Sequence, residues 1–422
     1  MFRLLLDKFQ WQGTDRIYSL PWMRNRLEYS ADPARVKEYI KGDEFTRSQL
    51  TRDMLSRFHL SHNSIVVSDD EHAHFLRSIF FECLPTQERY PEIAKKLVDE
   101  LFVAGDNREV RLSSSLIPSV YLSLLSNLLG ANVLKSLREH IRKIDFQPGT
   151  RPMHLDGLMY AFGMQLPGFG PMRKIIDLVF FKGDHYTRKI ALKLEKMVFE
   201  FATPKEGSWY AHLIELKQNG KITKAQFRGE LTSILVSSYA LSAAMSSMLL
   251  CLAARPEYAE KVRHDEKMAK HFVYEVLRLF PPFRQFGYER KGVWKKGGRS
   301  KEEATDFMVS IFGLQRNESV WEDPDDFRPQ RFAASGSTSG CKFMPFGVGK
   351  RSCTGRSYST SVLVEVLKYV CSEECNLHLT LPVDYEKDYV GLPLGTNGRL
   401  VSFPVDDRVY VRREPIEKGM AV

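Results

Sequence analysis

The residues best suited to chemistry lie in a glycine-rich segment, FMPFGVGKRSCTGRS, at positions 343–357. Gly347 and Gly349 precede Cys353, and Gly355 follows it by two residues. The residues that follow have a helical pattern, and the partial positive charge at the start of a helix favours a thiolate over a thiol. The segment therefore predicts a cysteine that is held as a thiolate.

A haem group would use each residue type in this segment. Glycines let the backbone approach a flat ring closely, and backbone amides directed at a ligating sulfur stabilise its negative charge. Arg351 can bind a propionate carboxylate through two parallel hydrogen bonds. The alternative is a glycine-rich turn with a buried cysteine. The pattern F-G-x-G-x-R-x-C-x-G fixes six positions at once, which chance rarely supplies, and it favours a haem-thiolate site.

The segment resembles the haem-binding loop of the cytochrome P450 family. This resemblance implies haem b (iron protoporphyrin IX) as the cofactor and Cys353 as the axial ligand of its iron. It also implies that the remaining loop residues contact the haem, namely Phe346, Gly347, Gly349, Arg351 and Gly355.

A second match lies upstream, where YEVLRLFPPF looks like the E-x-x-R helix of the same family. A Glu and an Arg three residues apart pair on one helix face, and alone such a pair is more often an ordinary surface pair. Here FRPQRF follows, and its Arg331 matches the arginine that completes the buried triad of the family. We interpret Glu275, Arg278 and Arg331 as a structural ion network that holds the loop of Cys353.

Further residues match family positions that bind the haem propionates. DDEHAHFLR resembles the propionate-binding helix, with His72 and Arg77 as candidates. Because the spacing of His72 and Arg77 differs slightly from the usual one, His74 is an alternative, and a solvated helix face is another. Arg284 and Tyr288 lie where the family often places one more propionate contact.

The long apolar segment at 227–254 predicts a helix that is buried on most faces. By the resemblance it crosses the distal face of the haem, where VSSYAL aligns with the usual A-G-x-[acid]-T-T of the family. Tyr239 then replaces the acid and Ala240 replaces the first threonine. The candidate catalytic positions are Ser237, Ser238, Tyr239 and Ala240.

This helix lacks the acid and alcohol that relay protons in typical family members, since no Asp or Glu lies between Glu230 and Glu257. Solvent or a substrate hydroxyl could replace the relay. Alternatively the enzyme uses peroxide or rearranges a hydroperoxide. Peroxide-using relatives often carry an arginine in this helix, and none lies between Arg228 and Arg255, which disfavours that subtype.

The remaining pattern is mostly helical with a minor β component. Helical periodicity covers 70–84, 90–103, 113–145 and 172–201 in addition to the distal segment. Alternation predicts a strand at 305–314, and the Asn-Gly turn signal in TNGRL predicts a hairpin near the C-terminus. We expect a mainly α fold with a smaller β part, the cytochrome P450 fold, as a single domain over 1–422.

The composition narrows the functional classes. The formal charge of +9 is spread along the chain, and no nucleic-acid-binding motif accompanies it. Six cysteines in 422 residues indicate a reducing compartment rather than a disulfide framework. Cys371 and Cys375 resemble a metal pair, but packed or half-exposed thiols late in a helix are the favoured interpretation. No apolar run reaches the length of a membrane span, so we expect a soluble, cytoplasmic protein.

The leading functional hypothesis is oxidation of an apolar small molecule, by hydroxylation or oxidative coupling, in secondary metabolism. The alternative is a haem-thiolate isomerase, dehydratase or peroxygenase that needs no redox partner. A non-enzymatic family member is a third possibility, but it predicts damage to the haem loop or the ion network. Electrons would come from an acidic ferredoxin or flavodoxin, attracted by a basic surface near Lys350 and Arg356.

Overall fold

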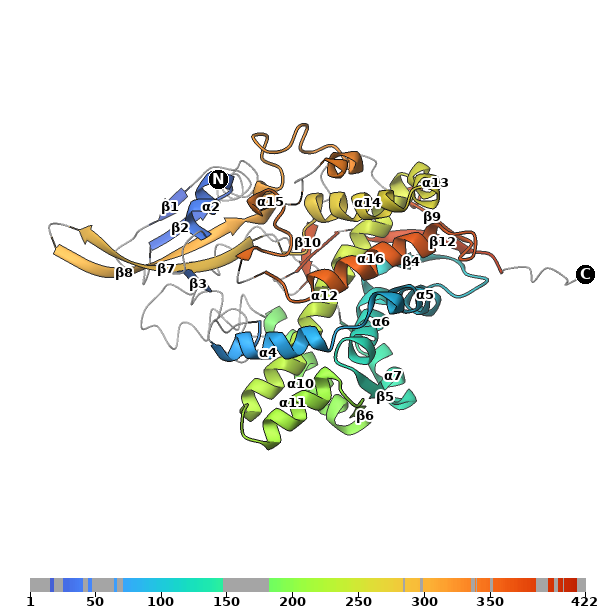
Figure 1. Ribbon diagram of the computed structural model, residues 1–422. Coiled ribbons are helices and arrows are strands. Elements are labelled where there is room, and N and C mark those ends of the chain that lie inside the picture. Colours follow the sequence, from blue (N-terminus) through green and yellow to red (C-terminus); the bar gives the residue numbers. More distant parts are fainter. Residues whose placement is uncertain are drawn as a thin grey trace, which may run out of the picture.

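The protein is described by a computed structural model of the 422-residue chain (Figure 1). The structure describes residues 16–18, 26–40, 45–47, 64–66, 71–146, 182–283, 285–296, 299–334, 338, 340–349, 352–384, 394–397, 401–404 and 406–415. Among the predicted site residues, Arg284 and Arg351 lie outside these ranges, and His72 is described only as part of its helix.

Helices dominate the described chain, which confirms the predicted mainly α fold with a smaller β part. The α-helices are α2 (Pro33–Ile40), α4 (Glu71–Glu82), α5 (Tyr90–Leu101), α6 (Leu112–Asn127), α7 (Lys135–Arg142), α10 (Lys182–Phe201), α11 (Trp209–Gln218), α12 (Lys224–Ala254), α13 (Glu257–His264), α14 (Glu266–Leu279), α15 (Ile311–Leu314) and α16 (Arg356–Cys371). Short 3-10 helices are η1 (Gln87–Arg89), η2 (Pro329–Ala333) and η3 (Gly340–Lys342).

The strands form small sheets rather than one layer through the molecule. They are β1 (Arg16–Tyr18), β2 (Arg26–Ser30), β3 (Phe45–Arg47), β4 (Asn107–Arg111), β5 (Ala131–Val133), β6 (Ala202–Pro204), β7 (Gln285–Lys296), β8 (Arg299–Ser310), β9 (Leu377–Thr380), β10 (Leu394–Asn397), β11 (Val401–Pro404) and β12 (Arg408–Arg413). A five-stranded sheet has the order β1-β2-β8-β7-β3, and β12 lies between β4 and β9. In Figure 1 the long β7–β8 ribbon extends away from the helices.

Helix α12 is the central element of the helical part. It begins with a capping box, in which the Thr223 hydroxyl accepts from the Gln226 amide and the Gln226 side chain accepts from the Thr223 amide. It ends at Ala254, because Pro256 has no amide hydrogen for the helix and disfavours the helical conformation of Arg255 before it. By length and composition it could cross a membrane, a possibility that the sequence interpretation excluded, but most of its apolar stretch is buried against other helices.

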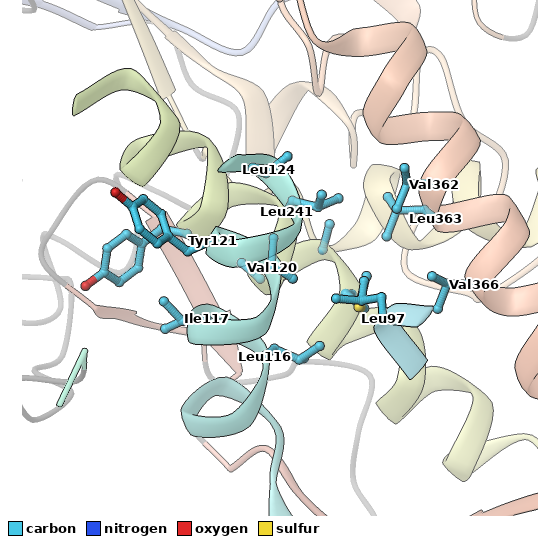
Figure 2. Packing of buried hydrophobic residues seen from close by; sticks show 14 of the residues in the cluster. Leu97, Leu116, Ile117, Val120, Tyr121, Leu124, Leu241, Val362, Leu363 and Val366 are labelled. Carbon is cyan, nitrogen blue, oxygen red and sulfur yellow. The ribbon is translucent and has the colours of Figure 1, made fainter. Parts of the chain in front are cut away.

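The core lies between α12 and the helices around it. In Figure 2, Val120 and Leu124 of α6 lie beside Leu241 of α12. The same cluster contains Leu116 of α6, Leu97 of α5 and Val362, Leu363 and Val366 of α16. All of these side chains are almost fully buried. This packing fixes the two elements that matter for the site, the distal helix α12 and α16, which begins just after Cys353.

Two predicted elements differ from the structure. The helical run at 113–145 is divided, because Gly130 takes a left-handed conformation with φ of 73° after α6, and the next residues form β5. The strand at 305–314 ends at Ser310, whose hydroxyl accepts from the Gly313 amide and starts the helical turn α15. The C-terminal hairpin is confirmed by the antiparallel pairing of β10 with β11.

Cys371 and Cys375 are packed thiols, as expected, but they do not share a helix. Helix α16 ends at Cys371, and Cys375 lies in the turn beyond it. Both side chains are buried, and burial raises the pKa of Cys371 to about 12 and that of Cys375 to about 11. Within the described part of the chain, no group of three potential ligands accompanies them.

Asp407 joins the C-terminal strand β12 to the start of α6. Its carboxylate accepts from the Ser113 amide at 2.6 Å, and its backbone carbonyl accepts from the Leu112 amide at 3.0 Å. The residue is 1% exposed, so the first amides of α6 depend on this single residue instead of water.

We predict that Asp407→Ala lowers the free energy of unfolding by about 1–3 kcal/mol, because it leaves the buried Ser113 amide unsatisfied. Urea unfolding of the purified protein measures this loss. The neighbouring Asp406, which pairs with Arg408 at the surface, provides the control. Asp406→Ala should cost less than about 1 kcal/mol, and equal losses for the two variants would contradict the capping role.

Candidate haem-thiolate site

Cys353 lies on a closed turn directly before α16. Its amide donates to the Phe346 carbonyl at 2.8 Å, and the Arg356 amide, the first of α16, donates back to the Cys353 carbonyl at 3.3 Å. All six cysteines lie in described parts of the chain, and Cys353 is the one with an exposed side chain. The thiol is therefore accessible to a ligand at the positive end of a helix.

Two glycines of the loop are required by its backbone. Gly347 has a φ of 68° and Gly349 a φ of 64°, a region that other residues adopt at a cost. Their turns are closed by bonds from the Gly347 amide to the Met344 carbonyl and from the Ser352 amide to the Gly349 carbonyl. Gly355 differs, because a Cβ atom there would meet the Cys353 sulfur at 3.8 Å, an ordinary contact distance.

An aromatic side chain and a cation lie beside this loop. Phe346 is half-buried against the main core, and the Arg356 guanidinium lies over its ring at 5.8 Å from the centroid. Arg356, which the sequence suggested only as a surface charge, thus also stabilises the loop.

Arg77 of α4 is the one predicted propionate ligand that the structure brings to Cys353 within the described chain. Burial lowers the pKa of Arg77, and the negative charge of the Cys353 thiolate opposes this shift. Such an interaction requires the two groups to lie close together, although 276 positions separate them in the chain. His74, on the same helix, is exposed. Arg77 is therefore placed toward the cysteine loop, and the propionate roles of Arg77, His72 and His74 stay predictions.

Tyr288 lies in a separate part of the interior. It belongs to β7 and is buried in a small cluster with Val36, Phe307 and Met344. Met344 is also the residue that closes the turn at Gly347, so this cluster supports the cysteine loop from the side of the sheet. The propionate role of Tyr288 stays a prediction.

The four candidate positions on α12 fall into two groups. Ser237 and Ala240, with Val236, form a partly accessible stretch on a helix that is otherwise almost entirely buried. The Ser238 hydroxyl instead donates to the Leu235 carbonyl at 2.7 Å. Tyr239 is also buried.

The Tyr239 hydroxyl donates to the Phe146 carbonyl at 2.8 Å, and the two aromatic rings meet edge to face. Tyr239 therefore ties the chain after α7 to α12. The arrangement leaves Ser237 as the hydroxyl on the accessible stretch, and the catalytic roles of all four residues stay predictions.

Glu275, Arg278 and Arg331 meet in one buried network. The guanidinium of Arg278 donates to both carboxylate oxygens of Glu275, at 2.7 and 2.8 Å. Arg331 donates to Glu275 at 3.1 Å, and the Arg328 amide adds a third donor at 2.7 Å. The carboxylate is fully buried, so its charge is compensated by protein groups.

The two arginines also bind the backbone of the segment that leads toward the cysteine loop. Arg278 donates to the carbonyls of Gln315, Pro324 and Asp326, and Arg331 donates to those of Glu322, Asp323 and Asp326. The side chain of Gln315 continues the connection by donating to the Lys342 carbonyl at 2.9 Å. The network thus holds residues 315–331 against α14.

Comparison with known proteins identifies this architecture. The sequence profile described as "Cytochrome P450" matches residues 169–363, a range that includes α12, the Glu275 network and the Cys353 loop. The matched region belongs to the cytochrome P450 family. Taurochenodeoxycholic 6 alpha-hydroxylase of Sus scrofa is 27% identical over 172 residues, which are 36% of this chain and 34% of that protein. The matched stretch thus spans about a third of the length of this relative.

Solved structures show the same fold over most of the chain. The structure of CYP175A1 from Thermus thermophillus matches with a TM-score of 0.68 and 20% identity, covering 97% of this chain and 94% of that one. An OleT cytochrome P450 in complex with arachidonic acid also has a TM-score of 0.68, with 16% identity, covering 93% and 90%. These structures establish the cytochrome P450 fold.

Haem b is the cofactor of the cytochrome P450 family, bound through a cysteine thiolate. The residues of this chain fit the group. Cys353 presents an accessible sulfur on a loop with two left-handed glycines, and Arg77 supplies a partly buried cation next to it. On the distal helix α12, Val236, Ser237 and Ala240 offer a small, mostly apolar surface.

Sequence reasoning missed one residue of α12, Glu230, which served only to mark the edge of the acid-free stretch. It is fully buried, and its carboxyl accepts from the Ile65 amide at 2.7 Å. Burial raises the pKa of Glu230 to about 8, although the Ile65 hydrogen bond opposes the shift. A lone acid among the apolar residues of this helix was the available signal.

We predict that Glu275→Gln lowers the free energy of unfolding by about 3–5 kcal/mol, because it leaves the buried Arg278 and the largely buried Arg331 without their counter-charge. Denaturant unfolding measures this loss. Glu365, which pairs with Lys368 at 3.0 Å near the surface, is the matched control. Glu365→Gln should cost at most about 1 kcal/mol, and a similarly small effect at Glu275 would be incompatible with a structural network.

Glu230 makes the stability of the protein depend on pH. Its folded-state pKa of about 8 lies above the ordinary value of 4.5, so folding takes up a proton between these values. The free energy of unfolding should therefore fall as the pH rises from the lower pKa to the higher one, by about 1.4 kcal/mol for each unit by which the pKa of Glu230 is raised.

Glu230→Gln keeps an acceptor for Ile65 and cannot ionise. We predict that this variant gains stability relative to the unmodified protein as the pH rises from about 5 to about 8. Thermal unfolding at a series of pH values measures the difference. Parallel pH profiles for the two proteins would rule out ionisation of Glu230 in this range.

Proposed function

We propose that this cytochrome P450 is a haem-thiolate monooxygenase or oxidase, which hydroxylates or oxidatively couples an apolar small molecule in secondary metabolism. The observation that carries the proposal is the accessible Cys353 thiol, on a closed glycine loop at the start of α16, with Arg77 beside it. The curated relative named above is a hydroxylase by its name, which supports the same type of reaction.

In this proposal Cys353 ligates the haem iron, and Arg77 and Arg351 bind the propionates. The bound haem supplies the activation of the oxidant. The start of α16 and the hydrogen-bonded turns of the loop keep the sulfur charged and in place. The Glu275 network acts at a distance, by holding the segment before the loop.

The accessible stretch of α12 supports an apolar substrate. Val236 and Ala240 offer small aliphatic side chains, and Ser237 offers a single hydroxyl. Because Ser238 and Tyr239 already donate to backbone carbonyls, we assign the handling of protons on this face to Ser237. The OleT structure, which holds arachidonic acid, supports the choice of a long apolar molecule as the substrate class.

A redox-partner-independent enzyme is the second candidate. Between Glu230 and Glu257 this helix has no carboxylate, and the Tyr239 hydroxyl is tied to Phe146. An isomerase, dehydratase or peroxygenase that works on a hydroperoxide or with peroxide would need no proton relay for dioxygen. This observation keeps that reaction class in consideration.

The proposed electron donor is a separate acidic ferredoxin or flavodoxin. Arg89 and Lys96 are exposed. Burial of Lys205 lowers its pKa, and the positive charges of Arg89 and Lys96 lower this pKa further. The three cations therefore form a basic cluster, and Arg89 also acts on Tyr358 near the start of α16. Such a cluster attracts an acidic carrier. Of the two contacts predicted from the sequence, Arg356 is partly exposed at the start of α16 and Lys350 lies outside the described residues. The cytoplasmic location stays a prediction.

We predict that the purified, reduced protein gives the carbon monoxide spectrum of a thiolate-ligated haem, and that Cys353→Ala loses it. Turnover is then measured with three oxidant systems: ferredoxin, reductase and dioxygen; hydrogen peroxide; and a fatty-acid hydroperoxide without reductant. Product only in the first supports the monooxygenase. Product from the peroxide or the hydroperoxide alone supports the second candidate.

Cys83, which directly follows α4, serves as a control for the spectrum. It is half-buried and distant in sequence from the loop, so Cys83→Ala should keep the thiolate band. A protein that binds no haem, or a band that survives in Cys353→Ala, would overturn the assignment of the ligand.

A further inference from the structure

Two buried oxygen atoms near the distal helix lack a hydrogen-bond partner among the residues that the structure describes. They are Ser64 Oγ and Glu230 Oε2, and both residues are 0% exposed. Both residues lie where the turn at residues 64–66 meets α12, because the amide of Ile65, next to Ser64, donates to the other oxygen of the Glu230 carboxyl at 2.7 Å. An unsatisfied buried polar group costs about 1–3 kcal/mol, so two at one place call for a ligand.

These atoms lie in line with the accessible stretch of α12. Glu230 precedes Ser237 by seven residues, which is about two helical turns, so the two side chains start from the same face of the helix. Their Cα atoms are about 10 Å apart along the axis. Phe227 and Leu231, on either side of Glu230 in the chain, are buried and apolar. A long molecule that lies along this face from Ser237 would bring its far end to Glu230.

We propose that Ser64 and Glu230 form a substrate subsite that binds the hydroxyl group of an otherwise apolar molecule. The subsite deepens the proposed function, on which it rests, because it names the polar end of the substrate. The Ile65 amide holds the turn at residues 64–66 against the Glu230 carboxyl, so in this proposal the hydroxyl binds between this turn and α12.

A hydroxyl matches the chemistry of the two residues. A serine hydroxyl and a protonated carboxyl can each donate and accept one hydrogen bond, which an alcohol can complete. The high pKa of Glu230, about 8 because of burial, keeps the carboxyl protonated at neutral pH. A carboxylate ligand brings a charge into the same apolar surroundings, where no described cation faces Glu230, and therefore binds less well.

The test uses the haem-loaded protein and three probes of equal chain length: n-decanol, n-decane and n-decanoic acid. Dissociation constants are measured by optical titration of the haem and by calorimetry. The readout is the preference for n-decanol, expressed as the ratio of the n-decane constant to the n-decanol constant. We expect Ser64→Ala to reduce this preference about fivefold, the value of one net hydrogen bond, and n-decanoic acid to bind more weakly than n-decanol.

Two further variants separate the subsite from general damage to the helix. Ser233→Ala removes a nearby hydroxyl of α12, which donates to the Glu230 carbonyl at 2.6 Å, and should leave the preference unchanged. Glu230→Gln keeps a donor and an acceptor and should retain the preference. In addition, the infrared band of the protonated Glu230 carboxyl should shift when n-decanol binds, but not when n-decane binds, and should be missing in Glu230→Gln.

An equal preference for n-decanol in the unmodified protein and in Ser64→Ala, with no shift of the carboxyl band, would overturn the proposal and leave bound water as the occupant. This failure is distinct from failure of the proposed function. In the latter case the protein lacks the thiolate-ligated haem spectrum, and calorimetry alone still measures the preference.

Discussion

The fold around the site depends on one buried carboxylate. Glu275 receives donors from Arg278, Arg331 and the Arg328 amide without contact with water. Charges taken out of water are tolerated only when their hydrogen bonds are complete, and the two arginines complete theirs with backbone carbonyls of residues 315–326. These hydrogen bonds fix the backbone of residues 315–326, most of which is not in a helix or strand.

The consequence reaches the cysteine loop through a short series of contacts. The Gln315 carbonyl accepts from Arg278, and its side chain binds Lys342, directly before the loop residues Phe343 and Met344. Met344 then accepts the amide of Gly347, and Phe346 accepts that of Cys353. The position of the sulfur thus follows from a network that contains no residue of the reaction itself.

Helix α12 combines two opposite requirements. Its burial stabilises the helical core, yet the proposed function requires one face to remain open for a substrate. The sequence meets both with small residues, since Ser237 and Ala240 fill little space while larger side chains pack against α6. Polar groups such as those of Ser238 and Tyr239 are satisfied by backbone carbonyls, whereas Glu230 retains an oxygen without such a partner among the described residues.

The sequence by itself determined the parts of the protein that rest on local chemistry. The left-handed glycines of the Cys353 loop, the Glu275–Arg278 pair on one helix face and the capping box of α12 follow from residue types at fixed spacing. Only the tertiary structure brought Arg77 toward Cys353, tied Tyr239 to Phe146 and enclosed Glu230 beneath Ile65. Each of these depends on contacts between distant segments, and periodicity along the chain carries no information about which distant group will lie opposite a side chain.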